Sequence, residues 1–130
     1  MADTTGKRAA QDTSHEQIKK RARYLYPKVL EALNNQLRRD ILDLLVQNPA
    51  KRWSFSEIKA AFPGLKNASL AHHLNILQQA WLVERITDLA SPRTAKDPYY
   101  CFYAITRFGK YVTRSFLRDV KEGLKLATSP

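Results

Sequence analysis

Apolar side chains in the first part of the chain recur at the three- and four-residue spacing of amphipathic helices. A first helix is expected to begin at Ser14, which has the spacing of a capping box with Gln17, and Pro27 interrupts or restarts it. Its apolar positions are Ile18, Ala22, Leu25 and Tyr26. A helix pair broken near Asn34 and stopped by Pro49 follows, with an apolar stripe of Val29, Leu30, Leu33, Leu37, Ile41, Leu44 and Leu45. Residues 1–13 have no such pattern and predict a flexible tail.

The middle of the chain alternates short elements with turns. Residues 52–55 predict a minimal strand, and Ser56 with Glu57 begins a short helix that Pro63 and Gly64 end. Asn67 is expected to be the N-cap of a helix over 67–79, whose apolar positions are Leu70, Leu74 and Leu77. The opposite face of that helix is polar, with Ser69, His72, Asn75, Gln78 and Gln79.

The last part predicts a hairpin and a helix. Residues 82–87 alternate apolar and polar side chains, and residues 99–105 are aromatic and β-branched, so both favour strands. The polar connection 88–98 predicts a long loop with Arg93 and Lys96 near its tip. Thr106 is expected to cap a final helix over 107–126, before a tail at 127–130. The apolar stripe of that helix is Phe108, Val112, Phe116, Val120 and Leu124.

The expected order is helix, helix, short strand, helix, turn, helix, strand, long loop, strand, helix. This order predicts a mainly α fold with a small β-hairpin (α+β), namely a winged helix-turn-helix domain over 14–126 with additional terminal helices. In such a domain the second helix of the pair fits the major groove, the first braces it across the backbone, and the hairpin loop reaches phosphates or a minor groove.

Composition narrows the classes of function. The 22 Lys and Arg residues against 12 Asp and Glu give a formal charge of +10, which favours polyanionic partners. The single cysteine, Cys101, excludes an internal disulfide framework and cannot form a zinc site alone. No apolar run approaches the roughly 20 residues that span a bilayer, and residues 1–20 lack a signal-peptide core, so we expect a cytoplasmic protein. The sequence contains no recognisable catalytic motif and no closely spaced set of metal ligands, so we expect no enzyme activity, no cofactor and no metal.

Residues 34–111 resemble the ArsR-like branch of winged-helix regulators. The segments that match its pattern, in order and spacing, are LNNQLRRDILDLL, SEI, SLAHHLNILQQAWLV and YAITRFG. Trp81 stands where that pattern has glycine, so the turn must accommodate a large side chain, buried or bracing the wing. The Cys-x-Cys type motif of metal-sensing members is absent from SFSEIKAAF, so metal sensing is not implied.

The resemblance implies a DNA-binding surface on the helix over 67–79. Base or phosphate contacts are expected from Asn67, Ala68, Ser69, Ala71, His72 and Asn75. Lys59 and Lys66 are expected at the phosphate backbone, unless they belong only to a solvated basic face. Arg93, with Lys96, is expected on the wing, where arginine favours narrow minor grooves. The helix holds no arginine, which favours A·T-containing sites or shape readout.

Two pairs of neighbouring residues have competing interpretations. His72 and His73 point in different directions on a helix, so we expect one to face DNA while the other packs. Arg38 and Arg39 are expected to be structural or surface residues rather than base readers.

The two terminal helices have apolar stripes that need a partner surface. One possibility is that they complete the core of a single copy. The other, which the resemblance implies, is that they form the interface of a homodimer. Such a dimer would present two recognition helices one DNA turn apart, a distance of about 34 Å. The expected interface residues are Ile18, Leu25, Phe108, Val112, Phe116, Val120 and Leu124.

The leading hypothesis is a sequence-specific regulator of transcription that binds double-stranded DNA, a repressor rather than an activator. The alternatives are a winged-helix module for protein-protein assembly and a nucleoid or RNA-binding protein without base readout. The sequence identifies no effector.

Overall fold

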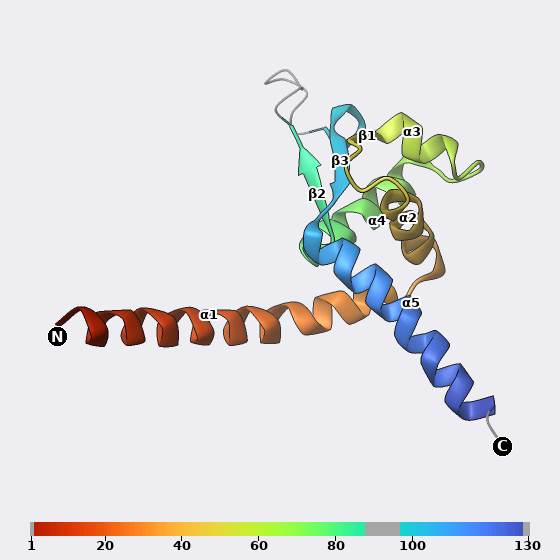
Figure 1. Cartoon of the computed structure of the whole chain (residues 1–130). Coiled ribbons are helices and arrows are strands. Elements are labelled where there is room, and N and C mark those ends of the chain that lie inside the picture. The colour runs from red at the N-terminus through yellow and green to blue at the C-terminus, as the bar shows by residue number, and fades with distance from the viewer. Residues whose placement is uncertain (1, 88–96, 129–130) are drawn as a thin grey trace.

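A computed structural model describes residues 2–87 and 97–128, and the side chains from residue 15 onward. The helices are α1 (Ala2–Leu33), α2 (Gln36–Val46), α3 (Phe55–Ala60), α4 (Asn67–Gln79) and α5 (Arg107–Thr128), and the strands are β1 (Trp53–Ser54), β2 (Val83–Ile86) and β3 (Phe102–Ile105). Figure 1 shows α2, α3, α4 and the sheet gathered into one body, from which α1 projects as a long arm. The predicted mainly α fold with a small sheet is confirmed.

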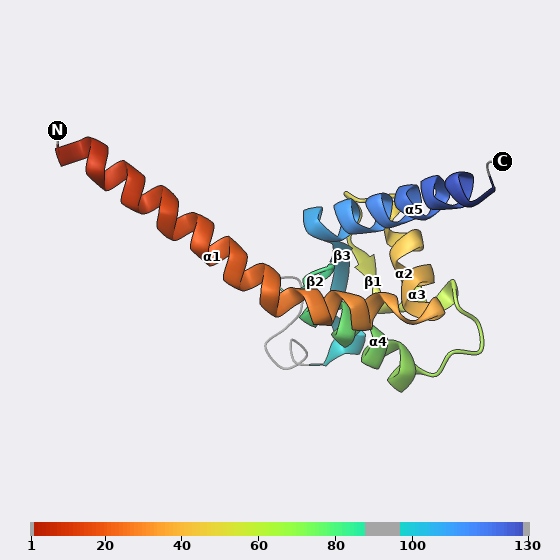
Figure 2. The ribbon, with the colours of Figure 1, turned by 90° about the horizontal axis from the view of Figure 1, so that it is seen from below.

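Helix α1 is longer than the sequence pattern predicts. It begins at Ala2 and continues through Pro27, so one helix replaces the predicted flexible tail at 1–13, the start at Ser14 and the interruption at Pro27. Residues 2–13 contain no proline, and extending an existing helix is far easier than nucleating one. Pro27 removes a single backbone donor and bends a helix rather than always ending it. Figure 2 shows α1 changing direction between its red arm and the orange end that packs on the domain.

The core lies where α2, α4 and the sheet meet the C-terminal end of α1. Its buried side chains include Ile41, Leu42 and Leu45 of α2 and Leu70, Leu74 and Leu77 of α4. The predicted buried face of α4 is confirmed. In α2 the predicted Ile41 and Leu45 are buried, but so is Leu42, which the predicted stripe lacks, whereas Leu44 is only half-buried and Leu30 of α1 is exposed. The core therefore fixes α4 by one face and leaves its other face outside.

Two arginines from the first turn of α2 cap the end of α1. Arg38 is buried, and its Nε donates to the carbonyl of Ala32 at 2.9 Å while its Nη2 donates to the carbonyl of Glu31 at 2.9 Å. The Nη1 group of Arg39 donates to the carbonyl of Leu33. These carbonyls belong to the last turn of α1, which has no intrahelical donors for them. The expected structural role of this arginine pair is confirmed.

The sheet is antiparallel, with the strand order β1, β3, β2. Val83 of β2 pairs with Ile105 of β3, and Trp53 of β1 pairs with Tyr103. Strand β3 is shorter than predicted because Pro98–Tyr100 forms a 3-10 turn. The Asp97 side chain accepts from the Tyr99 backbone N–H at 3.0 Å and starts that turn. Local side-chain bonding thus competes with the ladder where aromatic residues favoured a strand.

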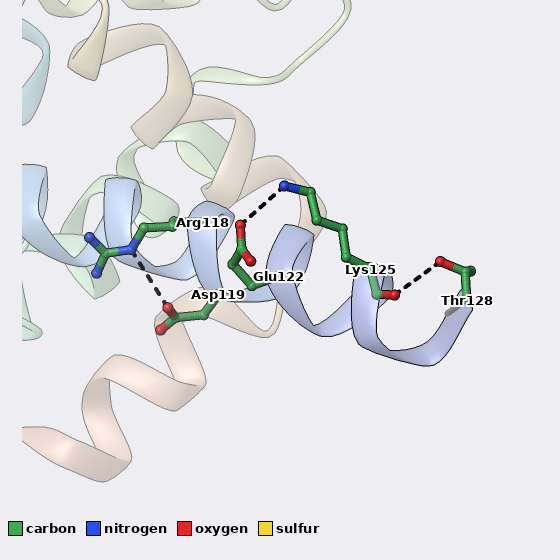
Figure 3. A network of polar contacts seen from close by, with 5 residues as sticks. All are labelled: Arg118, Asp119, Glu122, Lys125 and Thr128. Carbon is green, nitrogen blue, oxygen red and sulfur yellow. Dashed lines mark hydrogen bonds and ion pairs between the residues drawn. The ribbon is translucent and has the colours of Figure 1, made fainter. Parts of the chain in front are cut away.

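Thr106 caps α5, as predicted: its Oγ1 accepts from the Gly109 backbone N–H at 2.8 Å. The first half of α5 packs on α2 through the partly buried Val112, and its second half extends beyond the domain. Figure 3 shows that the polar contacts near this end join residues of α5 to one another: Arg118 to Asp119, Lys125 to Glu122, and Thr128 to the helix backbone. Within the described ranges, no helix is both long and apolar enough to cross a membrane.

Candidate nucleic-acid interface

The helix pair α3 and α4 lies between strands β1 and β2 in the sequence and begins with α3. Ser54 caps it: the Ser54 hydroxyl accepts from the Glu57 backbone N–H and the Glu57 carboxylate accepts from the Ser54 backbone N–H, both at 3.1 Å. The predicted start at Ser56 is therefore one residue late. The spacing S-x-x-E from Ser54 to Glu57 is the capping-box signal that would have placed the start correctly.

A tight turn separates α3 from α4. Gly64 has a φ of 88°, in the left-handed region that glycine adopts without strain. The chain then extends through Lys66, whose carbonyl accepts the first helical bond, from the Leu70 N–H at 3.0 Å. Lys66 is thus the N-cap, and Asn67, predicted as the cap, is the first residue of α4. No side chain caps this end, so the first-turn N–H groups of α4 face outward without a side-chain acceptor.

The outer face of α4 gathers the predicted contact residues. Ala68, His72 and Asn75 follow one another at four- and three-residue spacing and are all exposed. Asn67 is also exposed at the helix start, whereas Ser69 and Ala71 are half-buried at the edges of this face. We call Asn67, Ala68, Ser69, Ala71, His72 and Asn75 the outer face of α4. Their role in binding stays a prediction, but the structure places all six on or beside one accessible surface.

The two adjacent histidines have different environments. His72 is exposed, whereas His73 is half-buried and its Nδ1 accepts from Arg38 Nη1 at 3.1 Å. Burial lowers the pKa of His73, and repulsion from Arg38 and His72 lowers it further. His73 is therefore held neutral in the core-facing position, and it connects α4 to the arginine that caps α1. The sequence predicts that one of the two adjacent histidines packs within the protein, and this prediction is confirmed for His73.

Of the other predicted DNA-binding residues, the structure describes Lys59 and Lys66. Lys66 is exposed at the start of α4, and Lys59 is half-buried on α3. Arg93 and Lys96 of the wing lie outside the described residues, as do residues 88–96 as a whole. In the described part of the chain, no three His, Cys, Asp or Glu side chains come together as metal ligands would.

Trp81 forms the turn that ends α4. Its φ of 62° is left-handed, the Trp81 N–H donates to the Gln78 carbonyl at 3.0 Å, and the Leu82 N–H donates to the Leu77 carbonyl at 3.1 Å. These are the bonds of a Schellman motif, whose left-handed position is usually glycine. Trp81 is 52% exposed and its ring lies beside α1, with the Arg21 guanidinium 5.1 Å from the ring centroid. Trp81 was expected either to be buried or to brace the wing; it is not buried, its described contact is with α1, and the tip of the wing lies outside the described residues.

The predicted dimer residues divide into two groups. Leu25 is buried within one chain and Val112 is partly buried against the core, so the structure assigns both to the packing of a single copy. The periodicity of a stripe does not say which of its positions meet the chain's own core. The remaining five are exposed in one copy: Ile18, Phe108, Phe116, Val120 and Leu124.

Comparisons with known proteins agree with this architecture. Residues 33–86, about two fifths of the chain, match a family model described as a helix-turn-helix domain. No curated relative matches the sequence.

Several solved structures share the fold. One is the homodimeric winged helix-turn-helix DNA-binding domain of a possible ArsR-family transcriptional regulator from Mycobacterium bovis, with a TM-score of 0.62, 21% identity, and coverage of 86% of this chain and 93% of that one. Another is a transcriptional regulator homologue from Pyrococcus horikoshii, with a TM-score of 0.58, 21% identity, and coverage of 79% and 99%. A third is a possible HxlR family transcriptional factor from Thermoplasma volcanium, with a TM-score of 0.52, 24% identity, and coverage of 78% and 83%. The chain therefore has the winged helix-turn-helix fold that the resemblance to ArsR-like regulators predicts.

Proposed function

We propose that this winged helix-turn-helix protein is a sequence-specific regulator of transcription that binds double-stranded DNA as a homodimer, acting as a repressor in the cytoplasm. The observation that carries the proposal is the outer face of α4, a polar surface on a helix whose opposite face is fixed by three fully buried leucines, Leu70, Leu74 and Leu77. A rigid helix with an accessible polar face is what major-groove reading requires.

In the proposed complex, α4 lies in the major groove. The Asn75 amide can bond adenine in two places, His72 can donate to or accept from a base edge, and Ala68 can contact a thymine methyl group. Lys66 and the first-turn N–H groups of α4 bind phosphates, which sets the depth of insertion. Lys59 adds a backbone contact from α3. The wing at 88–98, with Arg93 and Lys96, contacts the backbone or a minor groove.

A homodimer is supported by the apolar side chains that one copy leaves exposed on α1 and α5, such as Ile18 at 64% and Leu124 at 60%. The similar M. bovis domain is described as homodimeric. Two copies present two α4 helices to successive major grooves, which doubles the contacts that read sequence. A bound dimer that covers a promoter blocks polymerase without a further contact.

The test begins with selection of binding sites from random duplex DNA, followed by affinity measurements on the selected site and on random DNA. Ala substitution of His72 or Ser69 is expected to reduce affinity for the selected site about tenfold and for random DNA much less. Lys66→Ala is expected to weaken both equally and to reduce the salt slope by about one. Lys121→Ala, which removes an exposed lysine from α5, is the charge-matched control and should change neither.

Three outcomes count against the proposal. Equal effects of all the α4 variants on both DNAs would indicate binding without base readout, as in a nucleoid protein. Tighter binding to RNA than to duplex DNA would also contradict it. Absence of binding to any nucleic acid would favour the protein-assembly alternative.

A further inference from the structure

Basic side chains form a stripe along one face of α5. They recur at three- and four-residue spacing, so at 3.6 residues per turn all of them fall within about 80° of arc around the helix axis. The stripe runs for about 27 Å at 1.5 Å per residue. One of its members is half-buried and the others are exposed. We call these residues the basic stripe of α5: Arg107, Lys110, Arg114, Arg118, Lys121 and Lys125.

The basic stripe carries more positive charge than α5 itself balances. Asp119 Oδ1 lies 3.8 Å from Arg118 Nε, and Glu122 Oε1 lies 3.3 Å from Lys125 Nζ, as Figure 3 shows. Both pairs are exposed, and exposed ion pairs contribute little stability, so the carboxylates of a ligand can replace them. Among the described side chains, the other four cations of the stripe have no ion-pair partner. Their charge is left for a polyanion to neutralise.

The basic stripe faces away from the outer face of α4. Val112 packs α5 against α2 and the core, and it lies on the opposite side of α5 from the stripe. Figure 2 shows α5 on one side of the domain and α4 on the other, with α2 between them. DNA that α4 contacts therefore lies on the far side of the domain from the stripe, and the stripe is available to a second partner.

The spacing of the basic stripe matches an acidic helix. Its cations recur about once per turn, or about every 5.4 Å, which is also the spacing of carboxylates placed three and four residues apart on a neighbouring helix. A straight stripe laid along a DNA duplex meets a phosphate backbone only at the groove edges, which lie about 6 and 12 Å apart. On a membrane the apolar face of α5 would have to enter the lipid, which would turn the stripe on its opposite face toward water. An acidic helix is thus the polyanion that uses the whole stripe.

A second copy of this chain does not supply such a helix. Helix α4 contains no acidic residue, and α2 and α3 each contain equal numbers of acidic and basic residues. Helices α1 and α5 are both net basic. No helix in the described part of the chain therefore carries a net negative charge, and two basic stripes repel each other. The acidic helix has to come from a different protein.

We propose that the basic stripe of α5 binds an acidic helix of another protein while α4 holds DNA. The helix that fits is one with a carboxylate on the same face at each turn. The proposal goes beyond the proposed function, because it assigns a protein partner to a surface that DNA reading does not use. It needs neither the homodimer nor base recognition, so it can be tested apart from them. On DNA, the stripe would hold that protein beside the site that α4 occupies.

The test uses synthetic helical peptides of about 20 residues, long enough to lie along the stripe. One peptide carries glutamates at alternating three- and four-residue spacing on one face, and the other distributes the same number of glutamates around the helix. Fluorescence anisotropy measures the binding of each peptide to the full chain. The one-face peptide is expected to bind at least about tenfold more tightly than the other, because only it places a carboxylate opposite each turn of the stripe.

Variants of the stripe locate the binding surface. Arg114→Gln combined with Arg118→Gln removes two central cations and should weaken binding of the one-face peptide about tenfold. Lys19→Gln combined with Lys20→Gln is the matched control, because it removes the same charge from exposed side chains of α1, and it should weaken binding less than about twofold. The two arginine substitutions lie far from α4, so the affinity for the selected DNA site should stay unchanged. Peptide and DNA should bind the protein at the same time.

A charge reversal separates loss of recognition from a folding defect. Arg114→Glu combined with Arg118→Glu should no longer bind the one-face glutamate peptide. It should instead bind a peptide with lysine at every glutamate position at least about threefold more tightly than the wild type does. A misfolded variant cannot gain such selective binding.

Several results would overturn the proposal. Equal binding of the two glutamate peptides, or an unchanged affinity in the arginine variants, would show that the stripe does not recognise an acidic helix. Competition between the one-face peptide and the selected DNA would place both on one surface. A larger loss of affinity for random duplex DNA, or for vesicles of anionic lipid, than for the peptide would assign the stripe to nucleic acid or to a membrane. Each of these results leaves base reading by α4 intact, whereas loss of the difference between selected and random DNA would remove the proposed function alone.

Discussion

Replacing the buried Arg38 of α2 with methionine is expected to destabilise the protein strongly. Methionine keeps most of the aliphatic volume of the arginine stem but removes the guanidinium. The carbonyl of Ala32 then loses the Arg38 donor, the carbonyl of Glu31 keeps only the Asn34 N–H at 3.3 Å, and His73 loses the group that bonds its Nδ1. All three partners come from elements that Arg38 holds together.

The magnitude follows from these bonds. A hydrogen bond from a charged donor contributes about 1.5–3 kcal/mol, and a buried carbonyl left without a donor has a comparable cost. The two lost carbonyl bonds therefore predict a decrease of about 3–6 kcal/mol in the free energy of unfolding, a large part of the 5–15 kcal/mol that is typical of a domain. Urea unfolding followed by circular dichroism at neutral pH measures this loss.

Arg39→Met is the matched control. Arg39 is less buried, and its guanidinium bonds the carbonyl of Leu33 and the side chain of Gln36, where water can replace it. We expect a loss of about 1 kcal/mol. Equal losses for the two variants, or a loss below about 1 kcal/mol for Arg38→Met, would refute the account of Arg38 as the cap that joins α1, α2 and α4.

Three further changes test other parts of the structure. Gly109→Ala places a β-carbon against the Leu82 carbonyl and should lower the free energy of unfolding by about 3 kcal/mol. Gly123→Ala meets no atom within 4 Å in an exposed helix and should raise it by about 0.5–1 kcal/mol. Urea unfolding that gives changes of the same sign for both variants would contradict the packing of α5. Ser54→Ala removes the cap of α3 and should lower the free energy of unfolding by about 1 kcal/mol. The midpoint of urea unfolding measures this loss, and an unchanged midpoint would argue against the capping box. The His73 pKa is lowered in the folded state, so the folded protein binds fewer protons than the unfolded protein, and stability should fall as the pH drops below 6.5. Between about pH 7.5 and about pH 5, the midpoint of urea unfolding should fall less in His73→Gln than in the wild type. Equal falls in the two proteins would contradict the neutral state of this side chain.

The sequence by itself determined the order of the elements and the buried face of α4. Leu70, Leu74 and Leu77 follow the helical period, and an apolar stripe must be buried wherever the helix packs, so the buried side of α4 was predictable. The cap at Thr106 was also predictable, because a capping side chain bonds the backbone only a few residues away. The order of these elements then sufficed for the winged helix-turn-helix fold.

Only the tertiary structure decided the features that depend on residues distant in sequence. Arg38 caps α1 from the first turn of α2 and contacts α4. The spacing of apolar residues carries no information about which carbonyls a guanidinium bonds. Leu25 belongs to the core of its own chain although its stripe also carries the exposed Ile18, because the place where α1 leaves the domain depends on how the helices pack.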